Sequence, residues 1–132
     1  MGSLNADNAK VSKVLMIDDN VIELNVCESI LKSTFSCNVQ AVKSVAGALD
    51  YLNKIKSVDE VPDIIICDLN LPYLDGYDFV KEYEKLPNLI QDNCKLFVLS
   101  GSYDDKDIAH FQKEKVVNRF LRKPLNTAEL IA

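Results

Sequence analysis

The sequence is poor in the residues that build zinc centres, fibres and membrane spans. It has a single histidine, His110, and four cysteines without a Cys-x-x-Cys pair, so it lacks the close ligand grouping of a zinc site. Only four glycines and four prolines occur in 132 residues, which excludes collagen-like and low-complexity sequence. The longest apolar runs, Ile64–Cys67 and Leu96–Leu99, are far shorter than the roughly 20 residues of a membrane-spanning helix.

Positive charge is also scarce. Lys and Arg total 15 against 20 Asp and Glu, a net charge of −5, which disfavours nonspecific binding to nucleic acid. The hydrophobic fraction of 48% and the length fit one globular domain whose core needs no disulfide or metal. The cysteines are therefore interpreted as reduced thiols of a cytoplasmic protein. Residues 1–11 lack the pattern of a secretory signal and are interpreted as a disordered tail or a cloning remnant.

Short apolar runs alternate with longer segments of helical periodicity. The expected strands are Val14–Ile17, Val39–Val42, Ile64–Cys67, Leu96–Leu99 and Val116–Leu121. The expected helices are Val21–Thr34, Val45–Lys56, Tyr77–Lys85, Asp105–Lys115 and a short one that begins at Asn126, with Asn20, Asp104 and Asn126 as caps. Such a repeat with right-handed crossovers predicts an α/β fold, a doubly wound parallel sheet with helices on both faces.

Ligands of these folds bind beyond the carboxyl ends of the strands, and polar residues stand there. They are Asp18 and Asp19 after the first strand, Asp68 and Asn70 at the third, Ser100 and Gly101 at the fourth, and Lys123 after the fifth. Carboxylates that lie close together repel one another, and oxygen ligands without histidine or cysteine favour Mg²⁺. A carboxylate can be a nucleophile, and phosphoryl transfer mainly requires positioning and charge neutralisation. The arrangement therefore predicts an aspartate that accepts a phosphoryl group.

Four motifs, VLMIDDN, DIIICDLNLPYLDGYD, FVLSGS and FLRKP, resemble those of the receiver domain of two-component response regulators. The chain is most similar in layout to the single-domain chemotaxis-type regulators. The resemblance covers about residues 12–131, so a receiver domain is expected over 12–132, with a short last helix. It implies a flavodoxin-like sheet of five parallel strands in the order 2-1-3-4-5.

The resemblance also implies a role for each matching residue. Asp68 becomes the phosphoacceptor, and Mg²⁺ is held by Asp18, Asp19, Asp68 and the backbone carbonyl of Asn70, with Asp19 as the more direct ligand of the acidic pair. The phosphoryl group is bound by Ser100, Gly101 and Lys123, and Phe120 occupies the position of the family's aromatic switch. Gly76 is expected to let the chain turn into the third helix.

The function implied is that of a phosphoacceptor in a cytoplasmic two-component phosphorelay. The phosphoryl donor is a histidine kinase or a phosphotransfer protein, and the domain is not an enzyme beyond its own phosphoryl transfer and autodephosphorylation. The phosphorylated domain acts on a downstream protein or an attached output domain, without direct contact with nucleic acid or membrane. A dimer through the face from the fourth helix to the fifth helix is a further expectation, and the chain is either a stand-alone regulator or part of a longer protein.

Three alternatives stay open on the sequence. One is a receiver-fold adaptor that binds partners without phosphorylation, which the complete set of acidic residues and Lys123 argues against. Another is an aspartate-nucleophile phosphatase, which needs a second acid at the position of Asn70. The third is a flavodoxin, but no glycine- and hydroxyl-rich loop follows the first strand. Taken singly, Asp18 and Asp19 also suit a helix cap, Ser100 a turn and Phe120 the core.

Overall fold

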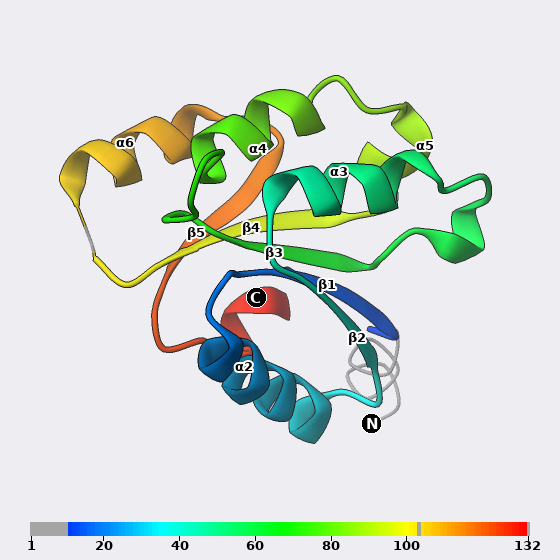
Figure 1. Cartoon of the computed structure of the whole chain (residues 1–132), viewed down its shortest axis with the longest axis horizontal. Coiled ribbons are helices and arrows are strands. Elements are labelled where there is room, and N and C mark those ends of the chain that lie inside the picture. Colours follow the sequence, from blue (N-terminus) through cyan, green and yellow to red (C-terminus); the bar gives the residue numbers. More distant parts are fainter. Residues whose placement is uncertain (1–10, 103, 132) are drawn as a thin grey trace.

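A computed structural model describes residues 11–102 and 104–131, so the expected tail lies outside the described residues except for Val11. The chain forms a five-stranded parallel sheet in the order β2-β1-β3-β4-β5, which confirms the predicted fold (Figure 1). The strands are β1 (Lys13–Ile17), β2 (Asn38–Val42), β3 (Ile64–Asp68), β4 (Lys95–Ser100) and β5 (Val117–Arg122).

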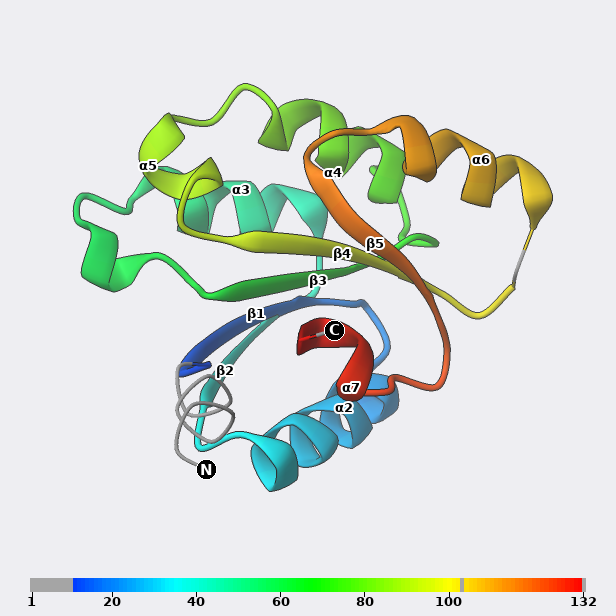
Figure 2. The ribbon, with the colours of Figure 1, turned by 180° about the vertical axis from the view of Figure 1, so that it is seen from behind.

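Helices cover both faces of this sheet, as Figures 1 and 2 show. One face carries α2 (Val21–Thr34) and α7 (Ala128–Ile131), and the other carries α3 (Val45–Asn53), α4 (Gly76–Tyr83), α5 (Asn88–Gln91) and α6 (Asp105–Lys113). The first helix has the predicted bounds, while α3, α4 and α6 each end earlier than expected. The single-turn helices α5 and η1 (Val58–Glu60) were not predicted, because one turn is too short to show a helical period.

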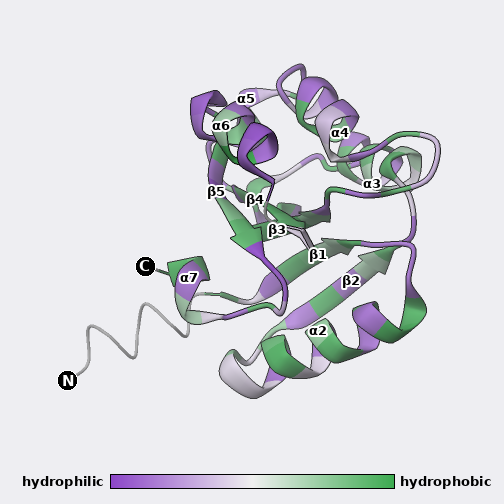
Figure 3. Ribbon diagram, turned by 90° about the vertical axis from the view of Figure 1, so that its left-hand side faces the viewer, coloured by the Kyte–Doolittle hydropathy of each residue, from purple (hydrophilic) through white to green (hydrophobic). Residues whose placement is uncertain are grey.

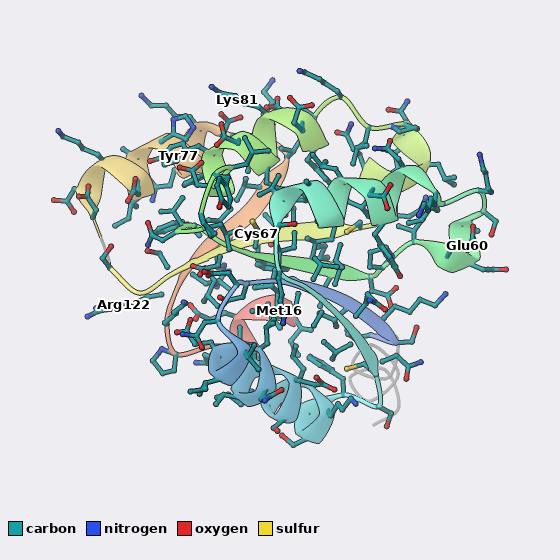
Figure 4. The ribbon with its side chains drawn as sticks, viewed as in Figure 1. Met16, Glu60, Cys67, Tyr77, Lys81 and Arg122 are labelled. Carbon is teal, nitrogen blue, oxygen red and sulfur yellow. The ribbon has the colours of Figure 1, made fainter. Side chains whose placement is uncertain are left out.

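The central strand β3 belongs to two hydrophobic cores at once. Ile64 and Ile66 point to the core shared with α2 and α7, whereas Ile65 and Cys67 point to the core shared with α3, α4 and α6. Figure 3 shows the hydrophobic residues along β1, β3 and β4, and Figure 4 shows Met16 and Cys67 on opposite sides of the sheet. The near-continuous apolar runs of the sequence are therefore strands covered on both faces, as predicted.

Side-chain caps begin the helices that flank the site. Asn20 Oδ1 accepts a hydrogen bond from the backbone N–H of Glu23 at 3.1 Å, and Asp104 Oδ1 accepts one from Lys106 at 2.7 Å. Asn126 Oδ1 accepts from the N–H of Ala128 at 3.1 Å. All three caps match the prediction, and they fix where the chain leaves the strand ends.

Gly76 serves the fold for a different reason than expected. The glycines in the described part of the chain have no positive φ, and the left-handed residue of this turn is Tyr73, with a φ of 66°. A Cβ atom on Gly76 would instead lie 2.9 Å from Leu69 Cα. Glycine is needed here because α4 begins against the backbone that follows Asp68.

The cysteines are free thiols, of which Cys27, Cys37 and Cys67 are buried and Cys94 is partly buried. They are therefore core residues in the main, as predicted. Among the described residues, no helix is both long enough and apolar enough to cross a membrane.

Candidate functional site

Asp18 and Asp68 leave neighbouring strands at the same edge of the sheet. Strands β1 and β3 are paired in register up to Ile17 and Cys67, so the two carboxylates that follow lie close together. Asp18 is completely buried and Asp68 is 4% exposed. Each carboxylate accepts one backbone N–H from its own turn: Asn20 donates to Asp18 Oδ1 at 3.0 Å. Asn70 donates to Asp68 Oδ1 at 3.3 Å.

Lys123 brings a positive charge to these two carboxylates. Its Nζ lies 3.5 Å from Asp68 Oδ1 and 3.8 Å from Asp18 Oδ2. The backbone N–H of Lys123 donates to the carbonyl of Ser100 at 2.8 Å, which ties the residue to the end of β4. Strand β5 therefore delivers the ammonium across the sheet edge, as the βα repeat predicted.

The shortest contact of Lys123 is with a residue that sequence reasoning missed as a site residue. Glu23 Oε2, on the first turn of α2, accepts a hydrogen bond from Lys123 Nζ at 2.6 Å. Oxygens of Asp18, Glu23 and Asp68 all lie within 4.8 Å of one another, a grouping that could hold a metal ion. The one sequence signal for this role was the position of Glu23 in the first turn of a helix that begins directly after β1, close to the predicted site.

Burial decides the electrostatics of the acidic pair. Burial raises the pKa of Asp18 to about 6, with the charge of Asp68 adding to the rise and the Asn20 hydrogen bond and Lys123 opposing it. Burial likewise raises the pKa of Asp68, against the attraction of Lys123. Among the described residues, the buried Asp18 Oδ2 has no hydrogen-bond partner. A buried carboxylate oxygen that accepts no hydrogen bond and lies beside a second carboxylate suits a hard cation such as Mg²⁺.

The remaining predicted site residues have less direct positions. Asp19 and Asn70 are exposed at the rim, and Asp19 is outside the three-carboxylate group. The Ser100 hydroxyl is buried in its own turn, where it donates to the carbonyl of Ser102 at 2.8 Å and accepts the Ser102 N–H at 3.2 Å. Gly101 adjoins Lys123, since a Cβ there would lie 3.8 Å from the lysine Cδ.

Phe120 lies away from the carboxylates, in an aromatic group between α4, α6 and β5. Its ring stacks on Phe111 with centroids 5.5 Å apart and an interplanar angle of 8°. The ring centroid of Tyr77, which Figure 4 labels on α4, lies 4.7 Å from that of Phe111 and 4.7 Å from that of His110. The predicted switch residue is therefore half-buried in the core, at the edge of the predicted partner face.

Comparison with known proteins decides the family. Residues 14–132 match the family model for the response regulator receiver domain. The chain belongs to this family. The predicted family and fold are thereby confirmed, and this receiver domain is homologous to the phosphoacceptor domains of histidine kinases and response regulators in two-component signalling.

Individual relatives agree with this assignment. The histidine kinase CKI1 of Arabidopsis thaliana is 28% identical over 122 residues, which cover 86% of this chain and 11% of that protein. A two-component response regulator from Cytophaga hutchinsonii shares the fold with a TM-score of 0.83, 26% identity and 92% coverage of both chains. The receiver domain of sensor histidine kinase PA1611 from Pseudomonas aeruginosa, solved with magnesium coordinated in its active-site cleft, has a TM-score of 0.72, 25% identity and 90% coverage of both chains. The receiver domain thus spans about a tenth of the first curated relatives that it matches.

Proposed function

We propose that Asp68 is the phosphoacceptor of this receiver domain. The observation that carries the proposal is the buried Asp18–Asp68 pair with Lys123 Nζ 3.5 Å from the acceptor oxygen. A carboxylate oxygen of Asp68 would attack the phosphorus of a phosphohistidine, forming an acyl phosphate as the P–N bond breaks. The leaving imidazole takes up a proton, so the domain acts as a signalling phosphoacceptor and not as a turnover enzyme.

Mg²⁺ is the cofactor that fits this donor set. The Oδ2 of Asp18, which accepts no hydrogen bond in the described structure, and the Asp68 carboxylate would be its anionic ligands, and Asp19 and the backbone carbonyl of Asn70 complete the predicted set. The magnesium ion in the active-site cleft of the PA1611 receiver domain supports the choice of metal. When bound, Mg²⁺ neutralises charge on the carboxylates and on the transferred phosphoryl group.

Lys123, Ser100 and Gly101 are proposed to bind the phosphoryl group on Asp68. Lys123 reaches it with little movement, while the Ser100 hydroxyl has to leave its hydrogen bond to Ser102. This displacement is proposed to let the Phe120 ring turn inward, which would change its present stack on Phe111. Phe120 has no hydroxyl, so the proposed switch is one of packing, and it would reshape the α6–β5–α7 face for a downstream partner, an attached output domain or a second copy.

The phosphoryl donor is proposed to be a histidine kinase or phosphotransfer protein that docks beside the site. Apolar side chains stand exposed on α2, with Ile22 74% and Val26 52% exposed. They line a groove of about 300 Å³ whose wall includes Glu23 and Lys123. A protein that covers this groove would bury apolar surface and place its phosphohistidine over Asp68.

The domain is proposed to occupy residues 12–132 and to act in the cytoplasm, where its free thiols stay reduced.

Intact-mass measurement after incubation with acetyl phosphate and Mg²⁺ tests the proposal that Asp68 is the phosphoacceptor. We expect an adduct of about 80 Da in the wild type. It should be absent from Asp68→Ala and retained in Asp59→Ala, which removes an exposed carboxylate on η1. An adduct that survives in Asp68→Ala would overturn the assignment, and no adduct in the wild type would favour a phosphorylation-independent adaptor.

A further inference from the structure

We propose that Glu23 is a positioning residue that competes with Asp68 for the Lys123 ammonium and thereby slows phosphorylation by small anionic donors. The proposal rests on the proposed function, because it concerns the reaction at Asp68. It assigns a task to a side chain that none of the sequence motifs includes.

The distances around Lys123 show which carboxylate has the stronger hold on it. Nζ is 2.6 Å from Glu23 Oε2, a short charge-assisted hydrogen bond, but 3.5 Å from Asp68 Oδ1. The contact with Asp18 Oδ2 is longer still, at 3.8 Å. The Lys123 ammonium is therefore hydrogen-bonded to Glu23 of α2, whereas its contact with Asp68 is a longer and weaker ion pair.

The backbone of both residues in this ion pair is held by hydrogen bonds. A movement of the Lys123 ammonium from Glu23 toward Asp68 therefore involves side chains alone. The N–H of Glu23 is held by the Asn20 cap at 3.1 Å. The N–H of Lys123 is held by the carbonyl of Ser100 at 2.8 Å. Only the flexible lysine stem has to swing when a phosphoryl group on Asp68 offers the ammonium a stronger anionic partner.

Glu23 also adds negative charge where an anionic donor has to arrive. Asp18, Glu23 and Asp68 bring three carboxylate oxygens within 4.8 Å of one another, and in the described part of the chain the Lys123 ammonium pairs with all three carboxylates. Acetyl phosphate is an anion, so the Glu23 carboxylate makes the site less attractive to it whether or not Mg²⁺ is bound, and the lysine that could attract it is already hydrogen-bonded to Glu23. Removal of the Glu23 charge should lower both obstacles.

The first test compares Glu23→Gln with a matched control, Glu28→Gln. Glu28 lies on the same helix and pairs with Lys32 at 2.8 Å, so its loss changes the net charge equally without touching the site. At Mg²⁺ concentrations shown by titration to saturate each variant, we expect Glu23→Gln to accept phosphate from acetyl phosphate roughly three- to tenfold faster than wild type. Glu28→Gln should match the wild type, and a Glu23→Gln rate equal to or below the wild-type rate would overturn the proposal.

The second test observes the lysine itself. In ¹H–¹⁵N spectra of lysine ammonium groups, the Lys123 signal is assigned by its disappearance in Lys123→Arg. We expect this signal to shift in Glu23→Gln and to stay in place in Glu28→Gln; an unmoved signal in Glu23→Gln would also overturn the proposal. Since this measurement needs no phosphorylation, it tests the position of Lys123 even if wild type takes up no phosphoryl group, which would count against the proposed function instead.

Discussion

The phenolic hydroxyl of Tyr77 donates a hydrogen bond to the carboxylate of Asp107, which joins the first turn of α4 to α6. The Tyr77 ring also packs on Phe111, and Phe111 stacks on Phe120 of β5. The hydrogen bond and these ring contacts are among the interactions that hold α6 against the rest of the domain. Both lie beside the face proposed to change on phosphorylation.

Replacing Tyr77 with Phe removes the polar contact and keeps the ring. Because the lost bond has a charged acceptor and is partly buried, we expect the free energy of unfolding to fall by about 1–2 kcal/mol. Urea denaturation followed by circular dichroism measures the change. Tyr73→Phe is the control, since the Tyr73 side chain is fully exposed and should leave stability unaltered. Equal stability of Tyr77→Phe and wild type would show that the bond contributes nothing.

The same tyrosine predicts a pH dependence. Burial, followed by the hydrogen bond to Asp107 and its charge, raises the pKa of Tyr77 to about 12 from the ordinary value of 10.0. The folded state therefore keeps the phenol protonated where the unfolded state ionises, so this contribution is complete below pH 10 and is lost as the pH rises toward 12. The stability advantage of wild type over Tyr77→Phe should shrink across that interval. An advantage that stays constant to pH 12 would contradict the assigned shift.

Asp18→Asn should stabilise the metal-free protein. The substitution removes a fully buried charge whose Oδ2 lacks a hydrogen-bond partner in the described structure. We expect a gain of roughly 1–2 kcal/mol in the free energy of unfolding, measured in EDTA. The exposed neighbour Asp19, changed to Asn, should give no such gain. In saturating Mg²⁺ the order should reverse, because Asp18→Asn loses a proposed ligand, and a loss of stability in EDTA would contradict the prediction.

The sequence was sufficient to predict which strand ends carry the site. Asp18, Asp68 and Lys123 converge because parallel strands in a βα repeat all end at one edge, a rule that needs no side-chain geometry. Glu23 was not predicted as a site residue, because its contact with Lys123 depends on how far its side chain reaches from α2 toward β5. Hydrophobic periodicity does not encode this reach. The hydrogen bonds that hold Ser100 in its turn are equally specific to the folded chain.

Gly76→Ala should disturb the support of Asp68. The new Cβ would lie 2.9 Å from Leu69 Cα and 3.4 Å from the Asp68 carbonyl oxygen, so α4 or the turn after β3 has to move. We expect a loss of about 1–3 kcal/mol in the free energy of unfolding, measured by thermal or urea denaturation. In Gly101→Ala the nearest atom outside the chain neighbours is Lys123 Cδ at 3.8 Å, an ordinary contact, so that variant should fold normally. Equal stability of the two variants would refute the close-contact argument.

The α2 groove predicts a difference between protein and small-molecule donors. Val26→Gln should slow transfer from a phosphorylated histidine phosphotransfer protein several-fold, because it places a polar group in the docking surface. Phosphorylation by acetyl phosphate should be unchanged, since Val26 lies outside the carboxylate group. Val58→Gln is the matched control: Val58 is also 52% exposed but lies on η1, at the opposite edge of the sheet. An equal effect of both variants on transfer would argue against docking at α2.

The double burial of β3 limits how a signal can leave Asp68. The residues before the acceptor alternate between two closely packed cores, so a shift of this strand would have to deform both at once. The central strands are therefore expected to keep their positions when Asp68 is phosphorylated. We expect the displacements on phosphorylation to be confined to the loops after β3 and β4, the side chains of Lys123 and Phe120, and the helices α6 and α7, with the backbone hydrogen bonds of the sheet unchanged.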